Sequence, residues 1–247
     1  SGKLGAPPSD EMVRKRLVGY LKASGTSEAK IREALVLWDP KTTTIDSRER
    51  LGKILATIGV VDPQILRWAE TVRCSDTGGV DIIRLEDEAT DSCFKDALKL
   101  WIAQGWIQRG RYGEALSLLD GIEPAELCDP ASYAFAVATI HHQRAEKKPG
   151  LELLEWLLQY SGAIPERYNV LGNLMYEDLR QLQTGSLDDI SRRMKQIHKQ
   201  LDLGRTGDNV LKTEDEVLQM LDKLIEEESK KQATIKIRLK IIETIID

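Results

Sequence analysis

Two adjacent histidines, His141 and His142, are the side chains in this sequence best suited by type to bind a metal ion. Two imidazoles on a helix share one ion when they stand four residues apart, because that spacing places them on one face. Consecutive helical residues point about 100° apart, and the residues four positions away are Ala145 and Ala138. We therefore expect histidines that pack in the core or line a groove, and we predict no metal site and no cofactor.

Other catalytic motifs are missing or stand in the wrong context. The sequence has neither the G-x-S-x-G turn of serine hydrolases nor the G-x-x-x-x-G-K-[ST] loop that binds phosphates. Asp76-Thr77-Gly78 occurs also in aspartic proteases, but those enzymes surround it with β-rich lobes, so we expect a turn over residues 75–81. A helical glycosidase would need two carboxylates facing each other across a cleft. We expect the charge runs to be exposed instead; they are Glu86–Glu88, Asp188–Asp189, Glu226–Glu228, and the basic group Arg192, Arg193, Lys195 and Lys199.

Net charge and cysteine content narrow the function classes. The formal charge of −5 argues against nucleic acid as a partner, because such proteins carry a basic excess or a dense basic stripe. No apolar run reaches the roughly 18 residues of a transmembrane span. Cys74, Cys93 and Cys128 cannot all pair within one chain, and none are in a CxxC spacing. We expect buried thiols, with one disulfide and one free thiol as the alternative.

Local start signals predict the helices that hold these residues. After a flexible lead-in over residues 1–9, residues 10–95 contain four short apolar stripes, which imply two antiparallel hairpins. Each stripe follows residues that cap helices: Ser9, then Thr26 or Ser27, then Asp46 with Glu49, then Asp62 with Pro63. Residues 82–85 could form a short extended segment.

From residue 96 the sequence repeats at intervals of 34 and 35 residues. A large residue precedes a small one at Ile102-Ala103, Val137-Ala138 and Leu171-Gly172. Such a period is typical of helical solenoids, in which small residues let helices approach closely. We predict that the three small residues lie at helix contacts, and that Trp106 and Leu119 lie in the core. Gly110 is expected at a turn with positive φ, and Gly105 on either a crowded or a ligand-facing side.

This spacing resembles the tetratricopeptide repeat, whose pattern is matched by Ile102, Ala103, Trp106, Gly110, Tyr112, Ala115 and Leu119. The segment Tyr168–Tyr176 is similar to the first helix of such a repeat, whereas Lys147 stands where the family has an aromatic residue. The resemblance implies an all-α fold of stacked antiparallel hairpins, an α-α superhelix, over residues 96–201. Its concave face would bind a protein or peptide. By resemblance, the residues that would line this groove are Gln104, Gln108, Thr139, His142, Asn173 and Glu177.

Residues 202–247 form an appended, amphipathic segment. Val217, Leu221, Leu224 and Ile225 make a helical stripe amid charged residues, and we expect it to be covered by the repeats, by a second copy or by another protein. Over residues 234–247, Ile235, Leu239, Ile242 and Ile246 fit a helix, while alternating residues fit a strand. Helix is favoured because no turn signal precedes this stretch.

These features favour a non-enzymatic scaffold that binds a protein or peptide partner. The alternatives are a structural protein that forms a homo-oligomer through its C-terminal helix and, third, an all-helical hydrolase with paired carboxylates. The segment from Tyr168 to Glu227 resembles uncharacterised bacterial proteins of exported or envelope type. That resemblance favours an exported protein, although no signal peptide is visible in the sequence, and the compartment is not predicted further.

Overall fold

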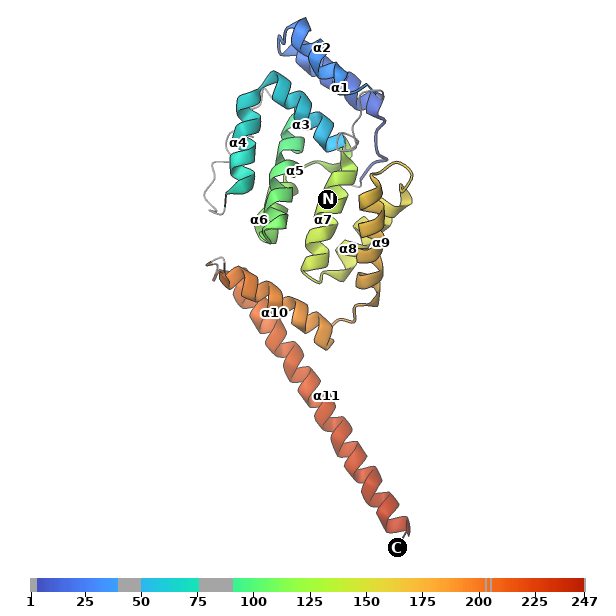
Figure 1. Cartoon of the computed structure of the whole chain (residues 1–247). Helices are drawn as coiled ribbons and strands as arrows, with labels where there is room; N and C mark the ends of the chain where they lie inside the picture. Colours follow the sequence, from blue (N-terminus) through green and yellow to red (C-terminus); the bar gives the residue numbers. More distant parts are fainter. Residues whose placement is uncertain (1–3, 40–49, 76–90, 203, 205, 247) are drawn as a thin grey trace. The chain divides into compact units, whose positions relative to one another are not determined.

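The computed structural model describes residues 4–39, 50–75, 91–202, 204 and 206–246, and throughout these ranges the secondary structure is helical, without a strand (Figure 1). This confirms the all-α fold class. The helices are α1 (Asp10–Ala23), α2 (Glu28–Val36), α3 (Arg50–Val61), α4 (Pro63–Cys74), α5 (Ser92–Gln108), α6 (Tyr112–Asp120), the short 3-10 helix η3 (Pro124–Glu126), α7 (Pro130–Gln143), α8 (Lys147–Gln159), α9 (Glu166–Gln181), α10 (Leu187–Asp202) and α11 (Asp208–Ile246).

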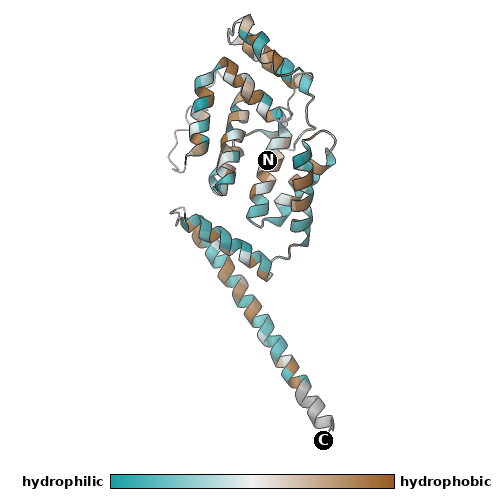
Figure 2. Ribbon diagram, in the orientation of Figure 1, coloured by the Kyte–Doolittle hydropathy of each residue, from teal (hydrophilic) through white to brown (hydrophobic). Residues whose placement is uncertain are grey.

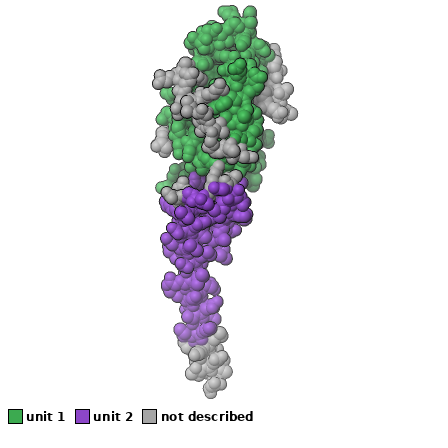
Figure 3. Space-filling view, turned by 90° about the vertical axis from the view of Figure 1, so that its left-hand side faces the viewer, with its two compact units in different colours: residues 1–142, 148–177 green, residues 143–147, 178–247 purple. Residues whose placement is uncertain are grey.

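The chain divides into two compact units, which are described separately. Unit 1 comprises residues 1–142 and 148–177, and unit 2 comprises residues 143–147 and 178–247 (Figure 3). Unit 2 therefore groups α10 with α11, whereas the sequence pattern grouped residues up to 201 with the repeats.

The helices of the N-terminal region begin where their capping residues predict. The Ser9 hydroxyl accepts a hydrogen bond from the Met12 amide at 3.2 Å, and the Ser27 hydroxyl accepts one from the Lys30 amide at 3.5 Å. The Asp62 carboxylate accepts the amides of Gln64 and Ile65, both at 3.0 Å. These bonds satisfy amides that have no partner inside the helix. The predictions for residues 46–49, 76–81 and 82–85, and for Glu86–Glu88, lie outside the described residues.

Unit 1 has a hydrophobic core to which α1 to α7 all contribute. Ala103, Ala138 and Gly172 are buried on the first helices of the three predicted hairpins, α5, α7 and α9. Trp106 is 3% exposed and Leu119 is fully buried, which confirms both as core residues. Gly110 has a φ of 73° between α5 and α6, as the turn prediction requires.

Three side chains of the α5–α6 hairpin donate hydrogen bonds to carbonyl groups at the C-terminal end of α4. The Trp106 indole donates to the Val72 carbonyl at 3.2 Å, the Arg109 guanidinium to the Arg73 carbonyl at 3.2 Å, and the Arg111 guanidinium to the Ser75 carbonyl at 2.6 Å. The last carbonyls of a helix lack partners within it and carry its negative dipole end. Two arginines and an indole therefore act as a long-range cap for α4.

Gly105 lies at a close contact between α5 and Arg73 of α4. A Cβ atom built there would stand 2.8 Å from the Arg73 carbonyl oxygen and still closer to the Arg73 Cγ atom. The Arg73 side chain meanwhile stacks on Trp101, with its guanidinium carbon 4.0 Å from the ring centre. The sequence left open whether Gly105 lies on a crowded or a ligand-facing side of its helix, and the structure supports the crowded side. A side chain at residue 105 would push against α4.

Replacing Gly105 with alanine is expected to lower the free energy of unfolding by about 1–3 kcal/mol, as overpacking does. This loss should occur although alanine is about 1 kcal/mol better than glycine inside a helix. Gly172→Ala is the matched control, because its nearest neighbour would be the movable Leu157 Cδ2 atom at 3.3 Å. Urea denaturation of both variants checks the prediction. A Gly105 variant as stable as the Gly172 variant would contradict it.

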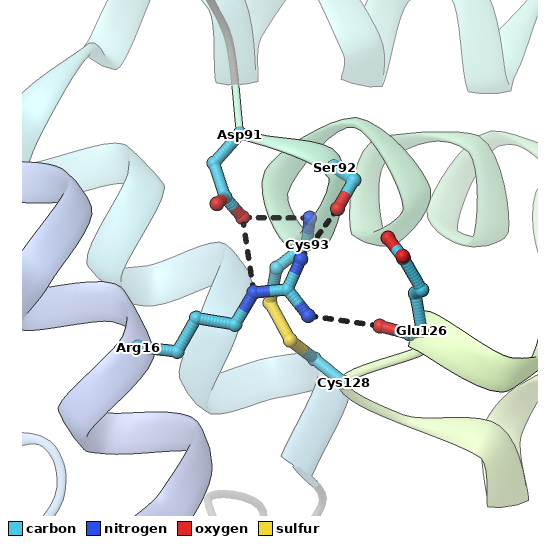
Figure 4. Close-up of a disulfide and its surroundings, with 6 residues drawn as sticks. All are labelled: Arg16, Asp91, Ser92, Cys93, Glu126 and Cys128. Atoms are coloured by element: carbon cyan, nitrogen blue, oxygen red, sulfur yellow. Dashed lines mark hydrogen bonds and ion pairs between the residues drawn. A yellow bond between two sulfur atoms is a disulfide. The ribbon is translucent and has the colours of Figure 1, made fainter. Parts of the chain in front are cut away.

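A disulfide joins Cys93 to Cys128, whose Cα atoms are 5.5 Å apart, and Cys74 is free and exposed. The expectation of unpaired buried thiols is therefore wrong, and its alternative holds. The bond fastens the first turn of α5 to the segment after η3 (Figure 4). Beside it, Arg16 of α1 hydrogen bonds to the Ser92 hydroxyl and to the Glu126 carbonyl, and lies 3.6 Å from the Asp91 carboxylate. This cluster ties α1 to both ends of the disulfide-closed segment.

Unit 2 contains the α10–α11 pair, in which Ile190, Val210 and Val217 are buried. The Arg193 guanidinium joins the two helices, because it lies 2.9 Å from the Asp189 carboxylate of α10 and 3.0 Å from the Glu216 carboxylate of α11. The other Asp189 carboxylate oxygen accepts the Gly185 amide at 2.9 Å.

Two expectations about charge runs are corrected by these contacts. Asp189 is 1% exposed, so it is an interior ion-pair partner and not part of an exposed acidic run. Arg192 and Arg193 are half-buried and engaged with carboxylates, so they do not form a solvated basic face. Glu226–Glu228 and the following Lys230 and Lys231 are exposed, as expected.

Residues 234–246 continue α11 without a break, which confirms the helical prediction for that stretch. The side chains of Leu239, Ile242 and Ile246 lie outside the described residues. In the preceding stripe, Val217 is buried and Leu221 and Leu224 are half-buried, but Ile225 is 63% exposed. Among the described side chains, the rest of the chain therefore covers this stripe only as far as Leu224.

Lys147, the residue that departs from the repeat pattern, has a specific role in unit 2. Its ammonium group donates to the Arg180 carbonyl at 2.9 Å and to the Leu182 carbonyl at 2.7 Å. Arg180 lies in the last turn of α9 and Leu182 directly follows that helix. A lysine placed there satisfies terminal carbonyls and suits the negative end of the helix dipole. Helix capping thus accounts for a lysine at this position.

Candidate functional site

The six residues assigned to a groove by resemblance all lie on the first helices of the predicted hairpins. Gln108, Asn173 and Glu177 are exposed, and the other three are half-buried. They are distributed over α5 (Gln104, Gln108), α7 (Thr139, His142) and α9 (Asn173, Glu177).

One candidate on α7 contacts helix α9. The Thr139 hydroxyl donates to the Phe135 carbonyl at 2.7 Å and lies 3.9 Å from the Met175 sulfur of α9. The Asn173 amide donates to the Asn169 carbonyl of its own helix at 2.8 Å. In contrast, α5 packs chiefly against α3, α4 and α6, so Gln104 and Gln108 belong to a different part of the helical layer.

Helix α9 is fixed from two sides. Tyr168 is buried, its hydroxyl lies 2.9 Å from the Ser132 hydroxyl of α7, and its ring stacks on Phe135 with ring centres 4.3 Å apart. Burial, together with the nearby Asp129 charge, raises the pKa of Tyr168 above its ordinary value, so the hydroxyl stays protonated and able to donate. On another side of α9, Gly172 packs against Leu154 and Leu157 of α8.

The outward side of this fixed helix carries three large aliphatic side chains. Val170, Leu171 and Leu174 are 53%, 45% and 63% exposed, and we call them the α9 apolar face. Their spacing places them together on one side of the helix, and the exposed Asn173 and Glu177 are close neighbours along it. Sequence reasoning did not identify this face. The helical period was visible, but periodicity alone does not tell which stripe is covered.

Unit 2 has a pocket of about 270 Å³ whose mostly polar lining includes two carboxylates. Asp178 and Asp188 line it, but Arg192 contacts both carboxylates, at 2.6 Å and 3.0 Å. Hydrogen bonding to Asp178 raises the pKa of Arg192 above its ordinary value, so the cation persists between the two anions. This is a charge-compensated ion-pair group, and it does not resemble an acid–base pair poised across a cleft.

Asp96 in α5 is the carboxyl group whose pKa departs furthest from the ordinary range among the described acidic residues. It is 8% exposed, and burial raises its pKa from 3.8 to about 6. The nearby Asp91 and Glu126 carboxylates raise it further, while Lys99 and Arg16 oppose the shift. Because the group sits beside the disulfide-linked segment in the core, its altered pKa reflects burial.

Asp96→Asn is expected to stabilise the protein by about 1–3 kcal/mol at pH 7.5, from the 1.36 kcal/mol that each pKa unit represents. The folded-state pKa is higher than the unfolded one, so ionisation destabilises the fold as pH rises from about 4 to about 6. The gain should therefore vanish below about pH 3, where aspartic acid is protonated in both states. Urea denaturation at several pH values tests this, with the exposed Asp120→Asn as control. A gain independent of pH would contradict the argument.

No protein-family model, curated protein or solved structure matches this chain. The all-α class therefore rests on the helices themselves, and the tetratricopeptide resemblance rests on the sequence pattern. Within the described residues, no cluster of three or more histidine, cysteine, aspartate or glutamate side chains could hold a metal ion. Nor does any described helix have both the length and the apolar content needed to cross a bilayer.

Proposed function

We propose that this protein is a non-enzymatic interaction scaffold, with unit 1 as a tetratricopeptide-like helical layer that binds a protein or peptide partner. The observation that carries the proposal is the α9 apolar face. Val170, Leu171 and Leu174 expose aliphatic surface on a helix that Tyr168 and Gly172 hold firmly in place. Contiguous exposed apolar surface on a soluble domain commonly marks an interaction site.

The surroundings of the face suit a binding role. Rigid placement of α9 lowers the entropy that would be lost when a partner orders the surface. Asn173 and Glu177 supply exposed polar groups beside the apolar centre, which is the arrangement of core and rim found in protein interfaces. Thr139 and His142 lie on the neighbouring α7. The α9 pair and the α7 pair are therefore the part of the predicted groove that we propose to contact the partner.

The test compares Leu174→Asp with Met12→Asp in the full chain. Both side chains are 63% exposed, one on the α9 apolar face and one on α1, so each substitution adds the same charge at an equally exposed site. Affinity capture from the native cell should recover a protein with the wild type and Met12→Asp but not with Leu174→Asp. Titration with the purified partner should then show at least about tenfold weaker binding for Leu174→Asp, which corresponds to about 1.4 kcal/mol.

Circular dichroism of both variants controls for folding. A partner that binds both variants equally would contradict the assignment to α9. Gln104→Ala combined with Gln108→Ala tests the remaining candidates, and we expect little effect because α5 packs chiefly against other helices.

A further inference from the structure

The second half of α11 stands apart from the helix that packs on its first half. At 1.5 Å per residue, the 39 residues of α11 span about 58 Å, while the 16 residues of α10 span about 24 Å. Side chains of α11 are buried or half-buried at intervals up to Leu224, and every described side chain from Ile225 to Arg238 is exposed. The described side chains of residues 225–238 therefore lie beyond the cover that α10 provides.

This exposed stretch is not a purely polar helix. Ile225, Ile235 and Ile237 are 63%, 56% and 60% exposed, and Figure 2 shows hydrophobic residues recurring along α11. Helices in water owe most of their stability to the packing of an apolar face. A long helix that presents isoleucines to solvent is therefore expected to pack against another helix.

One line of residues along α11 has the spacing of a coiled-coil seam. Steps of three and four residues alternate along it, which is the a/d pattern of paired helices. The seam consists of Leu218, Leu221, Ile225, Glu228, Gln232 and Ile235. Ile237 lies off this seam.

We propose that α11 pairs with α11 of a second copy of this chain, in antiparallel orientation about a two-fold axis near Lys230. The axis brings Ile225 of one copy onto Ile235 of the other, and Glu228 onto Gln232. A carboxylate facing an amide can accept a hydrogen bond from it. In a parallel, in-register pair, Glu228 would face Glu228, and two carboxylates in one seam repel each other.

The flanking charges select the same orientation. The exposed acidic run Glu226–Glu228 precedes an exposed basic group, which consists of Lys230, Lys231, Lys236 and Arg238. Antiparallel pairing brings Glu228 of one copy near Lys231 of the other, and Asp222 of one copy near Lys236 of the other. Within one copy, Lys230 pairs with Glu226 and Lys231 with Glu228 at the surface, and such exposed pairs are weak enough to exchange partners.

The first test is the mass of the full chain by light scattering across concentrations, with Ile235→Glu and Ile237→Glu beside the wild type. The two isoleucines are similarly exposed on the same helix, but only Ile235 is in the seam. We expect a dimeric wild type, at least about tenfold weaker association for Ile235→Glu, and an undisturbed dimer for Ile237→Glu. A monomeric wild type would overturn the proposal and leave a different protein as the occupant. Equal dissociation by both variants would also overturn it.

The second test determines the orientation by disulfide cross-linking in a Cys74→Ser background. Chains with Glu228→Cys are mixed with chains carrying Gln232→Cys and then oxidised. Antiparallel pairing predicts that the mixture forms cross-linked dimers much faster than Glu228→Cys chains alone. Rapid cross-linking of Glu228→Cys chains with one another would indicate a parallel pair and overturn the assigned orientation.

Discussion

Trp106→Ala is expected to lower the free energy of unfolding by about 3–5 kcal/mol, the usual cost of removing a buried tryptophan side chain. Trp106 is 3% exposed and belongs to the core of unit 1. Its loss would leave a cavity in that core, and it would remove the indole donor from the Val72 carbonyl. The guanidinium of Arg111, which is 1% exposed and lies 4.6 Å from the indole ring centre, would lose its stacking partner as well.

Urea denaturation followed by circular dichroism measures this effect. Trp101→Ala is the matched control, because Trp101 is only half-buried although its indole also donates a hydrogen bond, to Glu70 at 2.8 Å. We expect a clearly smaller loss for Trp101→Ala. An unchanged midpoint for Trp106→Ala would show that this residue is not part of the cooperative core.

Removing the disulfide by Cys93→Ala with Cys128→Ala should lower the free energy of unfolding by about 3–4 kcal/mol. The two cysteines are 35 residues apart, and a closed loop of that length restricts the unfolded chain by roughly this amount in the chain-entropy account. A reducing agent should lower the unfolding midpoint of the wild type and leave that of the double variant unchanged.

Cys74→Ala serves as the control for loss of a cysteine, because Cys74 is exposed and outside the disulfide. It should not shift the midpoint. If reduction left the wild-type midpoint where it was, the link would contribute nothing to stability, and the loop-closure argument would fail for this protein.

Helix positions were predictable from the sequence because the determining contacts are local. Ser9, Ser27 and Asp62 each bind amides two or three residues ahead, so short stretches contain the whole signal. The recurrence of small residues also predicted burial at Ala103, Ala138 and Gly172. A close helix contact that recurs along the chain requires small residues at regular intervals in the sequence.

The features that we did not predict from the sequence depend on contacts between residues far apart in the chain. Three cysteines allow three different pairs, and spacing alone does not select Cys93 with Cys128. Asp189 stands in an acidic run, yet its burial follows from Arg193 and the Gly185 amide. The α9 apolar face was overlooked for a related reason, because Leu171 has the residue type of a core position and only the three-dimensional arrangement leaves it uncovered.

The long-range cap on α4 has a consequence for how unit 1 folds. The donors at Trp106, Arg109 and Arg111 are 34 to 36 residues away from the carbonyls they satisfy. The last turn of α4 therefore gains these partners only after the α5–α6 hairpin has docked, which couples neighbouring helical pairs that could otherwise form separately. Amide hydrogen exchange in that turn should report the opening of the next hairpin and not merely local fraying. We therefore expect neighbouring hairpins in this region to unfold as one cooperative unit.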